Sequence, residues 1–192
     1  MPGLGQSQLL ALPWHEFADA PITINNTTIV INEVSNSGQG TGLNVWDGGA
    51  LLANYLKHQS EVDMHGARVL ELGAGTGVSG LSAALLGANV VLTDLEYTLP
   101  NLEANVAANE LGPPQVTVQK VDWFSPPEFE GTFDLVLMAD VVWMDDLVTP
   151  LVETMEVIPC NRKVWNFQST THSSSSSCNH VWSLPQCPVG DK

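Results

Sequence analysis

Basic residues are scarce in this sequence. Its 192 residues include six Lys and Arg against 21 Asp and Glu, which gives a formal net charge of −15. Affinity for nucleic acids comes largely from Lys and Arg side chains that replace counterions at the phosphates, so this balance argues against a nucleic-acid partner. An acidic surface suits a basic protein partner or a cationic substrate, although acidity that only maintains solubility explains the same composition.

Long apolar runs are also absent. No stretch approaches the roughly 20 apolar residues that a membrane-spanning helix needs. The N-terminal MPGLGQSQLLALPWHEF lacks the basic start and the small-residue cleavage site of a secretory signal. We therefore expect a soluble protein of the cytoplasm, or of the cytoplasm and nucleus, without a membrane partner. The length suits a monomer with one well-formed core.

Cysteine is rare, and its three copies mark a change of composition near Ile158. Residues 1–158 hold 20 acidic and three basic residues, whereas residues 159–192 hold one acidic residue, three basic ones and all three cysteines. A run of five serines occupies positions 173–177. We interpret residues 1–158 as one domain, incomplete at its end, and residues 159–192 as a divergent, largely irregular tail.

The tail contains potential metal ligands in His172, Cys178, His180 and Cys187. A Cys-x-His pair followed by six residues and another Cys is not a usual zinc-ligand spacing. The sequence therefore predicts no metal site.

The first ordered elements are expected after residue 21. Residues 22–34 alternate apolar and polar side chains around Asn25-Asn26, which predicts a hairpin with a tight turn. The loop GQGTGLN follows, and a helix is expected to begin at Trp46-Asp47 with Asp47 as its N-cap.

From residue 67 onward, strands alternate with helices. The expected strands are ARVLEL (67–72), NVVLT (89–93), QVTVQKV (115–121) and FDLVLMA (133–139). This alternation predicts an α/β fold with a Rossmann-like, mostly parallel sheet covered by helices on both faces. Ligands bind such sheets at the carboxyl ends of the strands. The residues at those ends are Glu71 to Gly77, Asp94, Asp122, Trp123 and Asp140.

The segment VLELGAGTGVSG (69–80) carries the main functional signal. Its glycines spell G-x-G-x-x-G, which alone is a weak sign of a dinucleotide site or simply of a tight turn. A dinucleotide site receives a pyrophosphate at the helix N-terminus. Here Glu71 places a carboxylate at the mouth of the turn, and the turn contains no Lys or Arg. The ligand that fits has an amino group, a ribose and a base but no phosphate, as S-adenosylmethionine does.

Five motifs in order resemble a known family. They are VWDGGALLANYL, VLELGAGTGVSGL, LTDLEYTLPNLEANV, VDW and MADVVW. Together they are similar to the methyltransferase-16 group of seven-strand S-adenosylmethionine-dependent methyltransferases, which includes protein-lysine methyltransferases. The resemblance covers about residues 22–158. It implies S-adenosyl-L-methionine as cofactor and a protein substrate that presents a lysine.

The resemblance also assigns roles around the cofactor. Gly73, Gly75 and Gly77 would let the backbone approach the methionine part, and Glu71 would orient its ammonium group. Asp94 would bind the ribose hydroxyls, or cap the helix that follows. The residues implied for the rest of the cofactor site are Trp46, Asp122, Trp123 and Ala139. Trp123 could instead be a core residue, and Trp46 could pack against the start of its helix.

The acceptor end is implied by DVVW (140–143), which matches the family's acidic-x-x-aromatic motif. Asp140 would align the lysine amine, and Trp143 would provide an aromatic wall. The family usually has Tyr in the last position of this motif. This chain has Trp143 there, which keeps the aromatic ring but lacks the phenolic hydroxyl.

Beyond Ile158 the family pattern calls for a fifth strand, a helix and an antiparallel pair. KVWNF (163–167) is a candidate fifth strand, and residues 168–192 show no periodicity for further elements. We expect the sheet to end near Val164 with an exposed, aggregation-prone edge. The sequence is consistent with three hypotheses: an active protein-lysine methyltransferase, a small-amine methyltransferase, or an impaired isoform that acts at most as a binding module.

Overall fold

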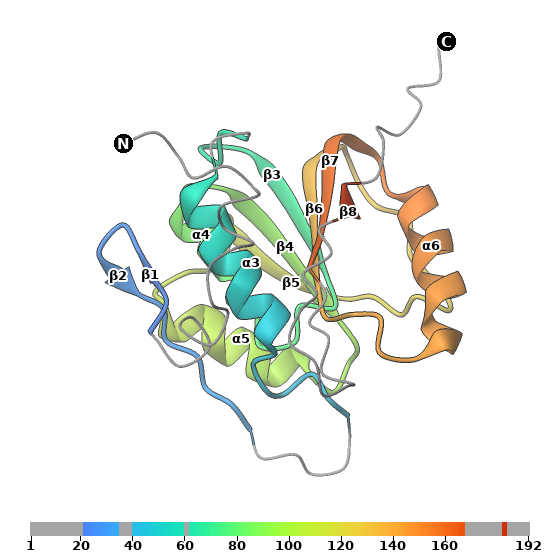
Figure 1. Ribbon diagram of the computed structural model, residues 1–192, viewed down its shortest axis with the longest axis horizontal. Coiled ribbons are helices and arrows are strands. Elements are labelled where there is room, and N and C mark those ends of the chain that lie inside the picture. The colour runs from blue at the N-terminus through green and yellow to red at the C-terminus, as the bar shows by residue number, and fades with distance from the viewer. Residues whose placement is uncertain (1–20, 35–39, 60–61, 168–181, 184–192) are drawn as a thin grey trace, which may run out of the picture.

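The computed structural model describes residues 21–34, 40–59, 62–167 and 182–183. Its main sheet consists of β3 (Arg68–Leu72), β4 (Asn89–Asp94), β5 (Val116–Lys120), β6 (Phe133–Ala139), β7 (Cys160–Phe167) and β8 (Trp182–Ser183). The strand order is β5-β4-β3-β6-β7-β8, and all neighbours are parallel except β8, which is antiparallel to β7. The predicted Rossmann-like sheet is confirmed (Figure 1).

Helices cover both faces of this sheet. They are α3 (Asp47–His58), α4 (Val78–Leu85), α5 (Leu99–Ala108) and α6 (Val148–Val157), with a short 3-10 helix η1 (Asp145–Leu147) before α6. Helices α3, α4 and α5 contribute to one core cluster and α6 to another (Figure 1). Pro150 lies in the first turn of α6, where proline needs no hydrogen-bond donor.

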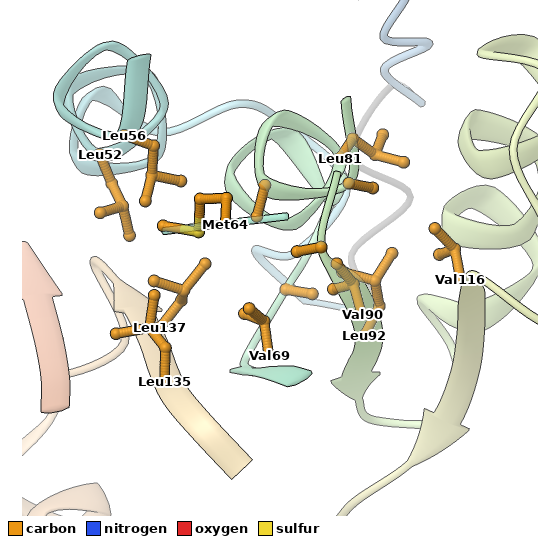
Figure 2. Close-up of a cluster of buried hydrophobic side chains, with 14 of the residues drawn as sticks. Leu52, Leu56, Met64, Val69, Leu81, Val90, Leu92, Val116, Leu135 and Leu137 are labelled. Atoms are coloured by element: carbon orange, nitrogen blue, oxygen red, sulfur yellow. The ribbon is translucent and has the colours of Figure 1, made fainter. Parts of the chain in front are cut away.

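The alternation of side chains along β3 explains this two-sided core. Val69 belongs to the cluster beneath α3 and α4, whereas Leu70 and Leu72 belong to the cluster beneath α6. Figure 2 shows Leu81 of α4 facing side chains of β3 and β4 in the first cluster. Full burial of such a side chain contributes about 1.5–3 kcal/mol, so these clusters are the main stabilisation of the sheet on which the site is built.

The N-terminal hairpin is confirmed as a small separate sheet. Strands β1 (Thr23–Ile24) and β2 (Thr27–Thr28) pair antiparallel across Asn25-Asn26. Both asparagines have positive φ, 48° and 67°, as a two-residue hairpin turn of the primed type requires.

The predicted N-cap of α3 is wrong. The N-cap position is Trp46, Asp47 is already helical, and Trp46 makes no side-chain capping hydrogen bond. The carboxylate of Asp140 takes the place of a local cap, because its Oδ2 accepts a hydrogen bond of 2.7 Å from Gly48 N. A tertiary contact has therefore replaced the local capping interaction that the sequence pattern favoured.

The predicted end of the sheet also needs correction. The fifth strand is confirmed as β7, but β8 pairs with it through Trp165–Ser183 and Asn166–Trp182. The expectation that the sheet ends near Val164 is thus wrong, and β8 is one short antiparallel strand in the region where C-terminal strands were expected to be missing. Two residues in extended conformation suffice to pair with part of an open strand edge, and they need no periodic pattern.

Part of the predicted tail lies outside the described residues, including His172, Cys178, His180 and Cys187. Among the residues that the structure does describe, no cluster of potential metal ligands occurs. Within the same ranges, no helix has the length and apolar character that crossing a membrane requires.

Candidate functional site

A cavity of about 340 Å³ opens at the carboxyl ends of the parallel strands. Every predicted site residue except Gly77 lines it: Trp46, Glu71, Gly73, Gly75, Asp94, Asp122, Trp123, Ala139, Asp140 and Trp143. Gly77 is the N-cap residue of α4 and lies in the chain between Thr76 and Val78, which both line the cavity. The structure thus brings together residues that are separated by almost 100 positions.

The glycine turn between β3 and α4 needs glycine for space and for backbone conformation. Gly73 and Gly75 have φ values of 66° and 55°, in the left-handed region that disfavours other residues. A β-carbon at Gly73 would lie 2.7 Å from Val141 Cγ1, and one at Gly75 would lie 3.0 Å from Gly42 O. The bare backbone therefore forms part of the cavity wall.

Glu71 is a buried carboxyl beneath this turn. The alternation of β3 directs its side chain toward α4, where Oε2 accepts a hydrogen bond of 2.9 Å from Gly80 N. Only 2% of the residue is exposed. Burial raises the pKa of Glu71 to about 8, hydrogen bonds from Gly80 and Ser79 oppose the rise, and the charge of Asp94 adds to it. A cationic group in the cavity would favour the ionised form.

Asp94 ends β4 and braces the same turn. Its Oδ2 accepts a hydrogen bond of 2.7 Å from Gly75 N, and its Oδ1 accepts one of 2.7 Å from Leu95 N. Burial raises the pKa of Asp94, and hydrogen bonds from Gly75, Leu95 and Thr98 act in the opposite direction. Thr98, not Asp94, is the N-cap residue of α5. The alternative role of Asp94 as the cap of that helix is therefore not observed.

A strap formed by residues 40–46 crosses the glycine turn. Thr41, Gly42, Asn44 and Trp46 line the cavity. Gly42 N donates a hydrogen bond of 3.3 Å to Tyr97 Oη, and Trp46 Nε1 donates one of 2.9 Å to Thr41 O. Trp46 thus lines the cavity and is also the residue that precedes α3. Its location is compatible with both predicted roles, as part of the cofactor site and as a residue packed against the start of the helix.

The wall after β5 consists of Asp122, Trp123 and Phe124. Asp122 Oδ1 accepts a hydrogen bond of 3.0 Å from Phe124 N, which fixes the turn after the strand. A β-carbon at Gly73 would lie 3.3 Å from Trp123 Cζ2, so the indole packs close to the glycine turn. Phe124 is 68% exposed. This arrangement provides a hydrogen-bond acceptor and two aromatic rings, groups that suit an adenine base.

The acceptor end predicted from DVVW lies at the end of β6. Asp140 has a φ of 51°, an uncommon value that aspartate tolerates better than most residues. Trp143 lines the cavity and is 59% exposed. It presents an aromatic ring to both the cavity and the solvent.

Asn105 of α5 supports the glycine turn from behind. Its Nδ2 donates hydrogen bonds to Thr76 O (3.0 Å) and Asn32 O (3.2 Å), and its Oδ1 accepts one from Asn32 N (2.8 Å). The side chain is fully buried. One amide therefore joins the N-terminal segment, the turn and α5.

Sequence reasoning missed several of these residues. Thr41, Gly42 and Asn44 lie in a glycine-rich stretch that predicts only a loop. Tyr97 lies within LTDLEYTLPNLEANV and Phe124 directly follows VDW, but neither motif assigns a role to them. The density of glycine in GQGTG was the available signal, because closely spaced glycines often mark a close backbone approach.

The lining residues fit S-adenosyl-L-methionine. Acidic groups at the glycine turn suit an ammonium group and ribose hydroxyls, and the mostly apolar remainder suits a base. Among the described residues that line the cavity, none is Lys or Arg. A pyrophosphate would find backbone donors here but no positive side chain, and it would meet the buried carboxyl group of Glu71 and the partly buried one of Asp94.

Comparison with characterised proteins agrees with this assignment. Mouse protein N-lysine methyltransferase METTL21A is 40% identical over 134 residues, which cover 65% of this chain and 59% of that protein. EEF1A lysine methyltransferase 3 from Xenopus tropicalis is 33% identical over 165 residues, covering 83% and 72% respectively. The chain thus spans little more than half the length of the mouse relative.

A solved structure supports the fold alone. The ribosomal protein L11 methylase of Lactobacillus delbrueckii subsp. bulgaricus superposes with a TM-score of 0.50 at 21% identity, covering 65% of this chain and 61% of that one. The family model described as lysine methyltransferase, Methyltransf_16, matches residues 23–179, most of the chain and well past Ile158. The cofactor of this family is S-adenosyl-L-methionine, and the chain belongs to the Methyltransf_16 lysine methyltransferase family.

Proposed function

We propose that this chain transfers a methyl group from S-adenosyl-L-methionine to a lysine side chain of a protein substrate. The observation that carries the proposal is the cavity itself. Glu71 and Asp94 flank a bare glycine turn, and Asp140 and Trp143 line the same cavity at the end of β6. A cofactor region and an acceptor region therefore share one opening. The names of the two relatives support lysine as the acceptor.

The cofactor supplies a methyl group carried on a sulfonium sulfur, and the chain's own residues must present the acceptor. A free lysine has a pKa near 10.4, so the neutral amine costs about 4.6 kcal/mol at pH 7. Asp140 aligns the amine, and water takes its proton. Trp143 covers the lysine stem, and no phenolic hydroxyl takes part, since this position is not Tyr. Positioning therefore supplies most of the catalysis.

The proposed partner is a protein with a basic surface around the target lysine. Four consecutive exposed residues, Trp143 to Asp146, adjoin the cavity and combine two apolar with two acidic side chains. With a net charge of −15, the chain would attract such a partner and repel nucleic acids. We further propose that the protein acts as a monomer in the cytoplasm or nucleus, away from membranes.

Labelled S-adenosylmethionine incubated with the chain and a cell lysate tests the function. We expect label on a protein band, in lysine after hydrolysis. EEF1A, which the name of the frog relative gives as its substrate, is a first purified candidate. Label confined to small molecules would favour the amine methyltransferase alternative. Cofactor binding without transfer would favour the binding-module alternative.

Cofactor binding is tested separately by calorimetry and thermal unfolding. S-adenosylmethionine and its demethylated product should bind and raise the melting temperature, whereas NAD should do neither. Asp94→Ala should weaken binding by about 1.5–3 kcal/mol, because it removes a charged acceptor from the cavity. Glu103→Ala, an exposed position on α5, is the matched control and should leave the affinity unchanged. NAD binding in place of S-adenosylmethionine binding would overturn the proposal.

The acceptor end is tested with Asp140→Ala. This variant should lose methyl transfer while its affinity for the demethylated cofactor stays close to that of the parent chain. Equal losses of transfer and of cofactor affinity would move Asp140 into the cofactor site.

A further inference from the structure

Helix α3 begins in a way that its own sequence does not explain. The first N–H groups of any helix lack partners within the helix. The N-cap residue of α3, Trp46, provides no side-chain acceptor. Gly49 N and Ala50 N donate hydrogen bonds to Trp46 O. Gly48 N instead donates a hydrogen bond of 2.7 Å to Oδ2 of Asp140, which lies 92 residues further along the chain. This distance lies at the short end of the range for N–H···O bonds.

Gly48 is needed here for space and not for backbone conformation. Its φ lies outside the left-handed region, so alanine could adopt the same backbone. A β-carbon at this position would however lie 2.7 Å from both Cγ and Oδ2 of Asp140 and 2.9 Å from Oδ1. Non-bonded carbon and oxygen atoms do not approach this closely without displacing one another. Only glycine at position 48 leaves the carboxylate where it is.

Asp140 is fixed from its own side as well. It directly follows β6, its φ is 51°, and its side chain lines the cavity. The N-terminal end of a helix favours a negative charge, so α3 also provides a suitable electrostatic partner. The carboxylate is thus held between the helix and the cavity.

We propose that Gly48 is a positioning residue: its N–H group holds the Asp140 carboxylate at the acceptor end of the cavity, and its missing β-carbon makes this contact possible. The inference rests on the proposed function, because it assigns Gly48 a role through Asp140. Gly48 itself is not among the residues that line the cavity. Its effect on transfer should therefore appear without a comparable effect on cofactor binding.

The contact is tested first without any activity measurement. A double-mutant cycle compares Gly48→Ala, Asp140→Ala and the double variant by thermal unfolding. Alanine favours helix over glycine, yet Gly48→Ala should lower the melting temperature of the parent chain by several degrees. In the Asp140→Ala background the same change should have no effect or raise it, since the obstructing carboxylate is gone. The strain of alanine at φ 51° is present in both Asp140→Ala chains and cancels. Equal effects in the two backgrounds would overturn the contact.

The positioning role is tested next by steady-state transfer of labelled methyl to the lysate protein that the parent chain methylates. Gly48→Ala should lower kcat at least tenfold and change the affinity for the demethylated cofactor less than twofold. Lys57→Ala, exposed in the last turn of the same helix, should change neither. An unchanged kcat, or a parallel loss of cofactor affinity, would overturn the positioning role. A parent chain that transfers no methyl would refute the proposed function, while the unfolding cycle would still decide whether the contact exists.

Discussion

Glu71 and Asp94 are two acidic residues at the same glycine turn, and they differ in how deeply their carboxyl groups are buried. Glu71 lies beneath the turn and is 2% exposed, whereas Asp94 is only partly buried and accepts two backbone hydrogen bonds. The pKa of Glu71 rises to about 8 because burial disfavours its charge. Burial therefore keeps Glu71 mostly neutral at pH 7, and a bound ammonium group would favour its ionisation.

This linkage predicts a pH dependence of stability. In the unfolded chain Glu71 ionises near 4.5, but in the folded chain it stays protonated up to about 8. The folded state thus binds the proton more tightly, and the free energy of unfolding falls by up to about 1.4 kcal/mol per pH unit across this window. Glu71→Gln removes this contribution. We expect chemical denaturation between pH 5 and 8 to show a smaller decline for the variant.

The same substitution separates stability from binding. The glutamine side chain that Glu71→Gln introduces keeps an oxygen for Gly80 N but cannot carry a negative charge. We therefore expect weaker binding of the demethylated cofactor at pH 8 despite equal or greater stability there. Parallel pH profiles for the two proteins would show that Glu71 ionises normally in the folded chain.

At the scale of elements, α5 joins parts of the chain that no strand pairing connects. Asn105 and Asn109, one turn apart, each bond both to the backbone of residues 30–32 and to a second backbone carbonyl. Only Asn105 is fully buried and only Asn105 also reaches the glycine turn, through Thr76 O. The two asparagines therefore form a matched pair that differs in burial.

Asn105→Ala is expected to destabilise the fold strongly. It removes the donor to the carbonyl of Thr76, which is buried, at about 1–3 kcal/mol for that unsatisfied group, and it also removes the part-buried contacts with Asn32. Asn109→Ala should cost less than about 1 kcal/mol, because water can replace its contacts. Denaturant titration measures both variants. A cost of Asn109→Ala equal to that of Asn105→Ala would mean that burial does not decide the effect.

Local patterns predicted most elements and the place of the glycine turn at the carboxyl ends of the strands. The apolar run FDLVLMA became the buried strand β6, and the glycines after β3 formed the turn that lines the cavity. The start of α3 was predicted less well. Its N–H partner is Asp140, and nothing in the residues around Gly48 indicates a carboxylate that is distant in sequence. The strap across the turn was also missed, because Gly42 contacts the turn and Tyr97 through its backbone atoms, which leave no side-chain pattern in the sequence.

At the scale of the whole molecule, the edge of the main sheet at β7 is only partly covered by another strand. β7 spans Cys160–Phe167, but β8 pairs only with Trp165 and Asn166. Among the residues that the structure describes, the remaining length of that edge has no strand beside it. Unpaired strand edges recruit other chains, so we expect the short β8 to limit association at this end of the sheet.

The closing prediction concerns this edge. In the double variant Trp182→Pro/Ser183→Pro, both residues of β8 lose the backbone N–H groups that a ladder needs, and proline is poorly accepted in paired strands. We expect the variant to form larger species as its concentration rises, measured by light scattering after size-exclusion chromatography. The control Trp182→Ala/Ser183→Ala keeps both N–H groups and should scatter like the parent chain, because backbone pairing is what protects the edge. If the alanine control associates as strongly as the proline variant, the side chains of β8 and not its hydrogen bonds protect β7. If neither variant associates, β7 does not pair with other chains even when β8 is lost, and the expectation of an aggregation-prone edge is wrong.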